Sequence, residues 1–281
     1  MNWGVHSKAL TELLRSRGQQ QFRTKTGRQL FQLSYHYIQI QSLLTGSGPA
    51  PEAREWFDAM KSSADGKEYI FMPSFDCGDQ AARIFKNATS SFDQANSAAE
   101  QLAAIENTFQ ACKALERSMQ KPLNDFLSSF IFGTPVDLPA KENESKSVLR
   151  IRNHHDTCML RLYSILLELI LQATSQPDIS NESVGRLIEL QQACVEESQF
   201  CICRILGALP QFLTTGHELN LPTWADTLRL LWPLRGILCS PAAQETQRWM
   251  AKAALRTIAY EGGIMQAVGS FFSNITIYES P

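Results

Sequence analysis

The stretch Leu228–Ala267 decides the fold, because it holds the densest set of helix start and stop signals in the chain. It contains the segments Leu228-Arg-Leu-Leu-Trp-Pro-Leu-Arg235, Ser240-Pro-Ala-Ala-Gln-Glu-Thr-Gln-Arg-Trp-Met250 and Ala259-Tyr-Glu-Gly-Gly-Ile-Met-Gln-Ala267. Ser240 is a suitable N-cap and Pro241 a suitable first helical residue. Gly262-Gly263 is suited to end a helix. We therefore predict one helix, a turn, a second helix and a restart after the two glycines.

The first of these two helices has a polar start and an internal proline. At its N-terminus the Thr223 hydroxyl can accept a hydrogen bond from a free backbone N–H, and the Asp226 carboxylate interacts favourably with the helix dipole. Pro233 lacks the N–H that would bond to the carbonyl of Arg229, so we expect the helix to be distorted there.

The second helix is amphipathic by its spacing. Its predicted core line is Met250, Ala254 and Ile258, flanked by Trp249 and Ala253. A basic line lies roughly opposite and consists of Arg248, Lys252 and Arg256.

Composition predicts a folded protein of one large or two ordinary domains. The chain has 281 residues, of which 44% are hydrophobic and 19% charged. A net charge of −2 and a pI near 6.2 argue against a dominant nucleic-acid footprint. Residues 1–30 are an exception, with six basic side chains against Glu12 alone. We interpret them as a solvated face, with a phosphate-contacting patch as the alternative; they are Lys8, Arg15, Arg17, Arg23, Lys25 and Arg28.

The sequence favours a soluble intracellular protein. Arg161 and Glu168 interrupt the most apolar run, Met159–Leu171, which leaves no stretch of the roughly 18 residues that a bilayer span needs. The first residues do not resemble a signal peptide. The cysteines, an odd number, lie mostly in apolar helical contexts, which is typical of buried, reduced thiols in the cytosol or nucleus.

The N-terminal third predicts a helical hairpin. Residues 2–17 have a suitable N-cap in Asn2 and a terminating glycine in Gly18. A second helix follows and stops in Gly46–Pro51. The predicted buried lines are Trp3, His6, Leu10, Leu13 and Leu14 on the first helix, and Leu30, Leu33, Tyr37, Ile40 and Leu44 on the second.

The remaining segments are also predicted to be helical, with two exceptions. Residues 62–79 and 133–146 contain proline, glycine and charge, and we interpret them as a loop and a weak linker. Pro122 should break or kink the helical stretch 80–132, and we divide the stretch there. The other predicted helices are residues 52–61, Val148–Ala173, which is apolar almost all round, and residues 181–209, ending at Pro210.

The predicted fold is therefore all-α, a multi-helix bundle of antiparallel helix pairs around a central hydrophobic helix, in one domain over residues 1–281. In the central helix, Arg161 and Glu168 are seven positions apart, so each can pair with the other's neighbours.

Residues that could carry chemistry do not converge in the sequence. His154, His155 and Asp156 are adjacent on a helix, where side chains diverge by about 100°, so we expect surface or helix-end packing. Phosphate-loop, metalloprotease and hydrolase motifs are lacking. We predict that the protein is not an enzyme and has no cofactor or metal. Trp224, Trp232 and Trp249 are interpreted as core residues, with an effector pocket between helices as the alternative.

Two separated sets of residues resemble the fungal-specific transcription factor domain, the regulatory region attached to binuclear zinc-cluster proteins. The C-terminal set is Trp232-Pro-Leu234, the helix carrying Trp249, and Gly263-Ile-x-Gln-Ala267. The N-terminal set runs from Trp3-x-x-His6 through Leu13-Leu-x-x-Arg17-Gly18 and Gln21-Phe22 to Gly27-Arg-x-Leu-Phe31. The family-signature residues, with structural roles, are Trp3, His6, Arg17, Gly18, Trp232, Pro233, Leu234, Trp249, Gly263, Ile264, Gln266 and Ala267.

The resemblance implies a nuclear protein that regulates RNA polymerase II transcription through protein partners, homodimer contacts or a small-molecule effector. It implies no association with a membrane. The six cysteines of a zinc cluster are lacking, because the closest pattern is Cys194-x6-Cys201-x-Cys203. DNA is then reached only indirectly, or through a missing N-terminal zinc cluster. We favour truncation at an internal methionine over a standalone regulator. The alternative function is a helical protein-interaction scaffold not involved in transcription.

Overall fold

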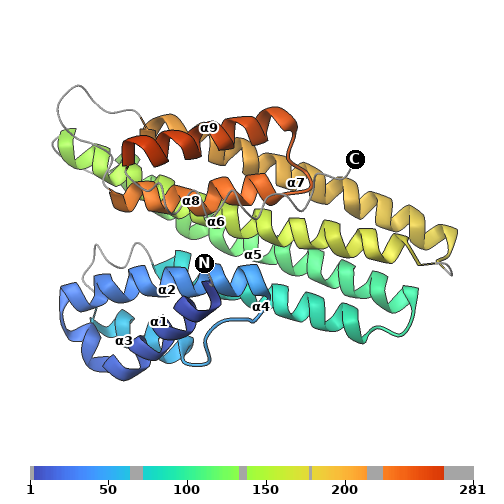
Figure 1. The fold of residues 1–281 in the computed structure, drawn as a ribbon, viewed down its shortest axis with the longest axis horizontal. Coiled ribbons are helices and arrows are strands. Elements are labelled where there is room, and N and C mark those ends of the chain that lie inside the picture. The colour runs from blue at the N-terminus through green and yellow to red at the C-terminus, as the bar shows by residue number, and fades with distance from the viewer. Residues whose placement is uncertain (1–2, 64–71, 133–137, 177–178, 214–223, 263–281) are drawn as a thin grey trace. The chain divides into compact units, whose positions relative to one another are not determined.

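All regular elements in the described part of the chain are helices, which confirms the all-α prediction (Figure 1). The structure, a computed structural model, describes the backbone of all residues except 1–2, 64–71, 133–137, 177–178, 214–223 and 263–281. The elements are α1 Trp3–Arg17, the 3-10 helix η1 Gln19–Arg23, α2 Lys25–Thr45, α3 Ala53–Ser63, α4 Met72–Gln94, α5 Ala98–Phe132, α6 Leu138–Thr174, α7 Asn181–Leu213, α8 Trp224–Cys239 and α9 Glu245–Gly262.

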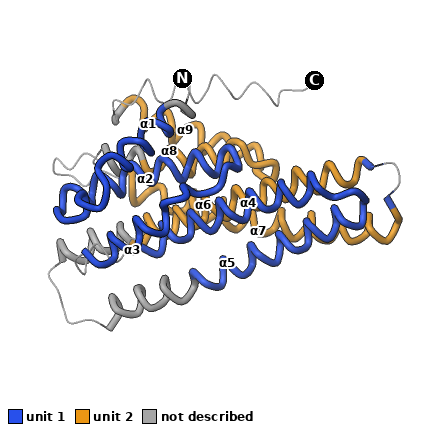
Figure 2. Tube along the Cα trace, turned by 90° about the horizontal axis from the view of Figure 1, so that it is seen from below, with its two compact units in different colours: residues 1–131, 176–179 blue, residues 132–175, 180–281 orange. Residues whose placement is uncertain are grey.

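The helices gather into two compact units (Figure 2). Unit 1 comprises residues 1–131 and 176–179, and unit 2 comprises residues 132–175 and 180–281. The prediction of a single domain remains a prediction. In the interpreted linker, residues 138–146 belong to α6, and residues 133–137 lie outside the described part.

The turns of unit 1 follow local signals that are visible in the sequence. Gly18 ends α1 with a φ of 53°, and Gly46 ends α2 with a φ of 68° while its N–H donates to the carbonyl of Ser42. The Thr24 hydroxyl caps the start of α2 by accepting from the Gly27 N–H at 3.1 Å. These caps place α1, η1 and α2 around one core.

That core is a cluster of aromatic side chains centred on Phe31 and Tyr35. Their rings stack at 5.3 Å between centroids, and Trp56 of α3 meets each edge-on at 5.8 Å. Phe22 of η1 meets Phe31 edge-on at 4.9 Å. The buried members of the cluster are Leu14, Phe22, Phe31, Tyr35, Ile38, Ala53, Trp56, Met60 and Phe75.

The cluster shows that the predicted buried line of α2 was wrong. Leu30 is 47% exposed, and the other predicted residues, Leu33, Tyr37, Ile40 and Leu44, are half-buried. On α1, Leu14 is buried, but Leu13 is 49% exposed and His6 is exposed. Because α2 is apolar on several sides, its helical period fits more than one face, and the aromatic partners from η1 and α3 select the one that is buried.

The predicted loop 62–79 was wrong for residues 62–63 and 72–79, which are helical, while residues 64–71 lie outside the described part of the chain. The predicted break at Pro122 was also wrong. Helix α4 begins at Met72, and α5 continues through Pro122 to Phe132. The break falls instead between α4 and α5, where the Ser97 hydroxyl accepts from the Glu100 N–H at 3.2 Å and the Glu100 carboxylate accepts from the Asn96 N–H at 2.6 Å. The Ser-x-x-Glu pattern of a capping box was present in the sequence, although the Glu100 carboxylate accepts from the residue before Ser97.

A buried carboxylate joins α2 to α4. Asp79 is 1% exposed, and the Tyr35 hydroxyl donates to it at 2.8 Å while Gln39 Nε2 donates at 2.9 Å. Burial raises the pKa of Asp79 to about 6, against the lowering effects of these two hydrogen bonds and of the Arg83 charge; Asp76 raises it further. The folded protein therefore binds this proton more tightly than the unfolded chain does.

We predict that this carboxylate makes unit 1 less stable as the pH rises. The stabilising effect of the proton is complete below about pH 4 and is lost as the pH rises through about 6. A pKa shift of one unit corresponds to about 1.4 kcal/mol, so the wild-type protein should lose about 3 kcal/mol of unfolding free energy between pH 4 and pH 7. Asp79→Asn has no carboxyl group to titrate at this position and should not show this loss. Urea unfolding across this range checks it. Parallel pH profiles of the two proteins would contradict the burial argument.

Unit 2 is built on α6, which packs against α7 and α8, while α9 packs against α7 and α8. From Asp156 to Ile170 the α6 side chains are buried except Arg161 and Glu168. These two pair with each other, with Arg161 Nη1 3.6 Å from Glu168 Oε1. The described part of α6 that follows residue 147 is thus the hydrophobic core helix that the sequence predicted.

Helix α6 also meets the length and composition criteria for a membrane span, contrary to the prediction from its charges. The candidate is Val148–Thr174, with a mean hydropathy of 1.3 over its most apolar window. Of that window, 72% is buried against other parts of the protein. Such burial is what the core helix of a helical bundle shows, so the criterion is weak evidence for a membrane.

Helix α7 continues to Leu213, three residues beyond the end predicted at Pro210. Pro210 removes only the bond from its own nitrogen, and the last turn of a helix needs few such bonds. Phe212, which follows the proline, is buried. Burial of this side chain gives a physical reason for the extension.

Candidate functional site

The turn between α8 and α9 is held by Arg248. Its guanidinium donates to the carbonyls of Leu238, Ser240 and Ala243, in the last case at 3.3 Å. Arg248 is a member of the predicted basic line, and its guanidinium is engaged by these backbone carbonyls. Each of these carbonyls lies in or near the end of α8, where backbone acceptors lack helical partners.

The predicted start of α9 at Ser240-Pro241 was also wrong, since the helix begins at Glu245. Ser240 is fully buried, and its Oγ accepts from Ser164 Oγ of α6 at 3.3 Å. The start is capped instead by Gln247, whose side-chain oxygen accepts from the Gln244 N–H at 2.8 Å. Gln247 Nε2 also donates to Gln199 Oε1 of α7 at 2.7 Å, which attaches the turn to α7.

The buried face of α9 differs from the predicted apolar line. Ala254 and Ile258 are buried as predicted, but Trp249 is 69% exposed and Met250 is 45% exposed. The buried side chains of the helix are Gln247, Ala251, Ala254, Leu255, Ile258 and Ala259. Small alanines allow α9 to pack closely on its neighbours, whereas the larger Trp249 is directed away from them.

The outer face of α9 therefore combines aromatic and cationic side chains. Arg256 follows Trp249 by seven positions, and Tyr260 follows Arg256 by four. The three side chains therefore point within roughly 40° of one another around the helix axis, opposite the buried face. Tyr260 is 75% exposed, and Lys252 is exposed beside this line. We call Trp249, Lys252, Arg256 and Tyr260 the α9 face. Glu245 lies one turn before it.

The four side chains of the α9 face make no hydrogen bond, ion pair or ring contact within the described part of the chain. An exposed tryptophan at such a position is informative, because large aromatic side chains are usually buried. Aromatic residues and arginine are also the types that contribute most to binding at protein interfaces. The face can therefore bind another surface.

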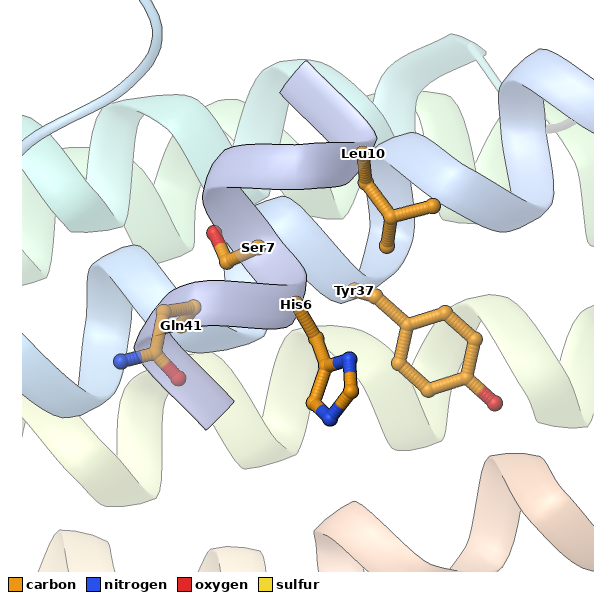
Figure 3. A pocket seen from close by; sticks show the side chains of 5 residues that line it. All are labelled: His6, Ser7, Leu10, Tyr37 and Gln41. Atoms are coloured by element: carbon orange, nitrogen blue, oxygen red, sulfur yellow. The ribbon is translucent and has the colours of Figure 1, made fainter. Parts of the chain in front are cut away.

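A small cavity lies between α1 and α2 in unit 1. Its volume is about 280 Å³, and Figure 3 shows His6, Ser7 and Leu10 of α1 across from Tyr37 and Gln41 of α2. The lining surface is mostly apolar, although it includes the imidazole, hydroxyl and amide groups of these side chains. His6, which was predicted to lie on a buried line, is thus an exposed residue at the edge of a cavity.

The adjacent His154, His155 and Asp156 are not at the surface or at a helix end, as predicted, but in the middle of α6. Asp156 is fully buried, and its Oδ1 accepts from Arg204 Nη2 of α7 and lies 3.1 Å from His155 Nδ1. His154 Nε2 lies 3.7 Å from Cys158 Sγ. The guanidinium of Arg204 also lies over the Phe200 ring, 4.2 Å from its centre.

This cluster has unpartnered polar atoms. Asp156 Oδ2 and His155 Nε2 are buried without a hydrogen-bond partner among the described residues. The sequence showed the three residues together, but it could not show that α7 supplies an arginine. The arrangement is an ion pair that joins α6 to α7.

The cysteines do not form a metal centre in the part of the chain that the structure describes, where no group of three potential ligands converges. Cys194 and Cys201 are buried and Cys203 is exposed, which fits the divergence expected on a helix. Burial raises the pKa of the Cys194 thiol to about 12. Cys77, Cys112 and Cys158 are also buried, and Cys239 is exposed.

The fungal-specific transcription factor domain family matches the chain over residues 1–268. The chain belongs to this family. No curated protein and no solved structure matches the chain. The fungal-specific transcription factor domain assigns the chain a general role in the regulation of transcription, and it is not a family of enzymes. It also suggests a nuclear location.

The signature residues of this fungal-specific transcription factor domain have different environments. Trp232, Pro233 and Leu234 are buried in α8, and Gly18 ends α1 with a positive φ. Exposed positions include His6, Arg17 and Trp249. A structural role for the whole set stays a prediction. Gly263, Ile264, Gln266 and Ala267 lie outside the described residues, as do the side chains of Trp3 and Trp224.

Proposed function

We propose that this chain is a regulatory domain that modulates RNA polymerase II transcription in the nucleus by binding a protein partner through the α9 face. The observation that carries the proposal is the exposure of Trp249 and Tyr260 beside two cations on the side of α9 opposite its buried face. Family membership supports the transcriptional role, and the exposed aromatic and cationic side chains support the α9 face as the place of contact.

The size of the cavity and the chemistry of the α9 face favour a protein partner over a small effector. The cavity between α1 and α2 measures about 280 Å³. Small-molecule sites usually have at least roughly 300 Å³. The α9 face, by contrast, has the aromatic and arginine content of a protein interface.

Some of the N-terminal basic side chains bind groups of the protein itself, which supports indirect rather than direct contact with DNA. Arg15 lies 2.7 Å from Glu52 and also pairs with Glu12, and Arg28 is buried with its guanidinium donating to the Phe22 carbonyl at 2.9 Å. Two of the six cations are thus engaged within the protein. We propose that DNA is reached through a partner or through a zinc-cluster module outside these residues.

A tethering experiment tests the proposal. The full chain, fused to an unrelated DNA-binding domain, should change the output of an RNA polymerase II reporter several-fold in either direction, compared with that DNA-binding domain alone. Trp249→Ala/Tyr260→Ala should return the output to the baseline, because both side chains are exposed and their loss leaves the fold intact.

The matched control is Ile188→Ala, which truncates an exposed apolar side chain of α7 in the same unit. It should leave the reporter output unchanged. An output of the wild-type fusion equal to that of the DNA-binding domain alone would contradict the proposed function. Equal loss in the control variant would contradict the assignment to α9.

A further inference from the structure

The charge on the α9 face is one-sided. From residue 246 to residue 260 the sequence of α9 contains three cations and no carboxylate. Arg248 is engaged by the carbonyls at the α8–α9 turn, which leaves Lys252 and Arg256 as the exposed charges of the face. Glu245 stands at the start of the helix, outside the segment between the two aromatic residues.

The order of side chains along α9 places the charges between the aromatics. Lys252 follows Trp249 by three positions, Arg256 follows Lys252 by four, and Tyr260 follows Arg256 by four. These are the spacings of neighbours on one side of a helix. The face thus has an apolar group at each end and two cations in the middle.

We propose that the α9 face binds an acidic amphipathic helix, in which carboxylates one turn apart lie between two large apolar side chains. The carboxylates meet Lys252 and Arg256, and the apolar side chains cover Trp249 and Tyr260. Arginine can bind a carboxylate in a two-pronged arrangement, and both aromatic rings offer apolar surface to a partner side chain. The inference rests on the proposed function for its biological setting, but the binding itself is independent of it.

The test uses the full chain and a synthetic peptide. The probe is a labelled amphipathic helical peptide with two Glu residues four positions apart, flanked by Phe and Leu. Two peptides of the same sequence carry Gln or Lys in place of Glu. Fluorescence anisotropy should show tightest binding of the Glu peptide, with weaker binding as salt is raised. Trp249→Ala should weaken it by roughly tenfold or more, as expected for an interface tryptophan.

Charge reversal gives the sharpest result. Lys252→Glu/Arg256→Glu should no longer bind the Glu peptide and should bind the Lys peptide instead. Arg23→Glu/Lys25→Glu makes the same charge change at exposed positions of unit 1 and should leave Glu-peptide binding nearly unchanged. Circular dichroism confirms that both variants are folded.

Several outcomes would overturn the inference. They are equal binding of the Glu and Gln peptides, no change in preference on charge reversal, and equal loss in the control. Tighter binding of a DNA duplex than of the Glu peptide, or self-association that Trp249→Ala abolishes, would identify a different occupant. If the reporter responds to Trp249→Ala/Tyr260→Ala while the Glu peptide fails to bind, the proposed function stands and the acidic-helix inference falls. The reverse pattern retains the inference without the regulatory role.

Discussion

Arg204→Met should lower the free energy of unfolding by about 3–5 kcal/mol, the usual effect of removing one partner from a buried ion pair. Asp156 is fully buried, and the Arg204 guanidinium donates to its Oδ1. Methionine keeps most of the arginine stem but not its charge, so the loss reports on the carboxylate left behind. Urea unfolding followed by circular dichroism measures it.

Asp156→Asn shows whether Arg204→Met acts through the loss of the ion pair or through the loss of side-chain packing. Arg204 keeps 30% of its side chain exposed and can be hydrated when its partner is neutral, so this variant should cost less than Arg204→Met. Combining the two substitutions should recover most of the stability that Arg204→Met alone loses, because no buried charge remains unpaired. A double variant as unstable as the single one would show that the ion pair is not what matters at this position.

Gly27→Ala is expected to destabilise unit 1 by at least about 3 kcal/mol, at the upper end of the effects of overpacking. A Cβ at this position would lie 2.0 Å from the backbone oxygen of Gln21 and 2.9 Å from Thr24 Oγ1. The backbone oxygen cannot rotate away as a side chain does. Relief of the clash requires a shift of the first turn of α2, which disturbs the Thr24 cap.

Gly185→Ala is the matched control for that substitution. Gly185 lies in α7, and a Cβ there would meet nothing within 4 Å. Alanine should stabilise the protein by about 0.5–1 kcal/mol, because glycine loses more conformational freedom in a helix. The two variants should therefore shift the urea midpoint in opposite directions. Similar destabilisation by both would refute the steric account of Gly27.

Sequence reasoning predicted the helices well where local chemistry ends them. Gly18 and Gly46 stop α1 and α2 because glycine adopts positive φ without strain, and this depends on the residue alone. The Ser97-x-x-Glu100 cap between α4 and α5 was equally local, but it was overlooked in favour of Pro122. A proline removes one backbone hydrogen bond, and flanking helical turns that continue can accommodate this loss.

The candidate site was less predictable, because it depends on which face of α9 is buried. Trp249 was assigned to the core because large aromatic side chains are usually buried. The sequence alone contains the alternation of alanine and larger residues on α9, but it does not show which side meets α7 and α8. The sequence placed Arg248 on a basic line with Lys252 and Arg256, but it could not show that Arg248 binds the carbonyls of Leu238 and Ser240 at the end of α8.

The sequence by itself thus determined the all-α class, the glycine-ended hairpin of α1 and α2, the apolar central helix and the family resemblance. These follow from composition, helical period and caps, which act over a few residues. Tertiary structure alone decided that Phe31 and Tyr35 are buried rather than Leu30, that Arg204 reaches Asp156, and that Trp249 is exposed. Each depends on contacts between residues far apart in the chain, and a period along one helix does not specify its neighbours.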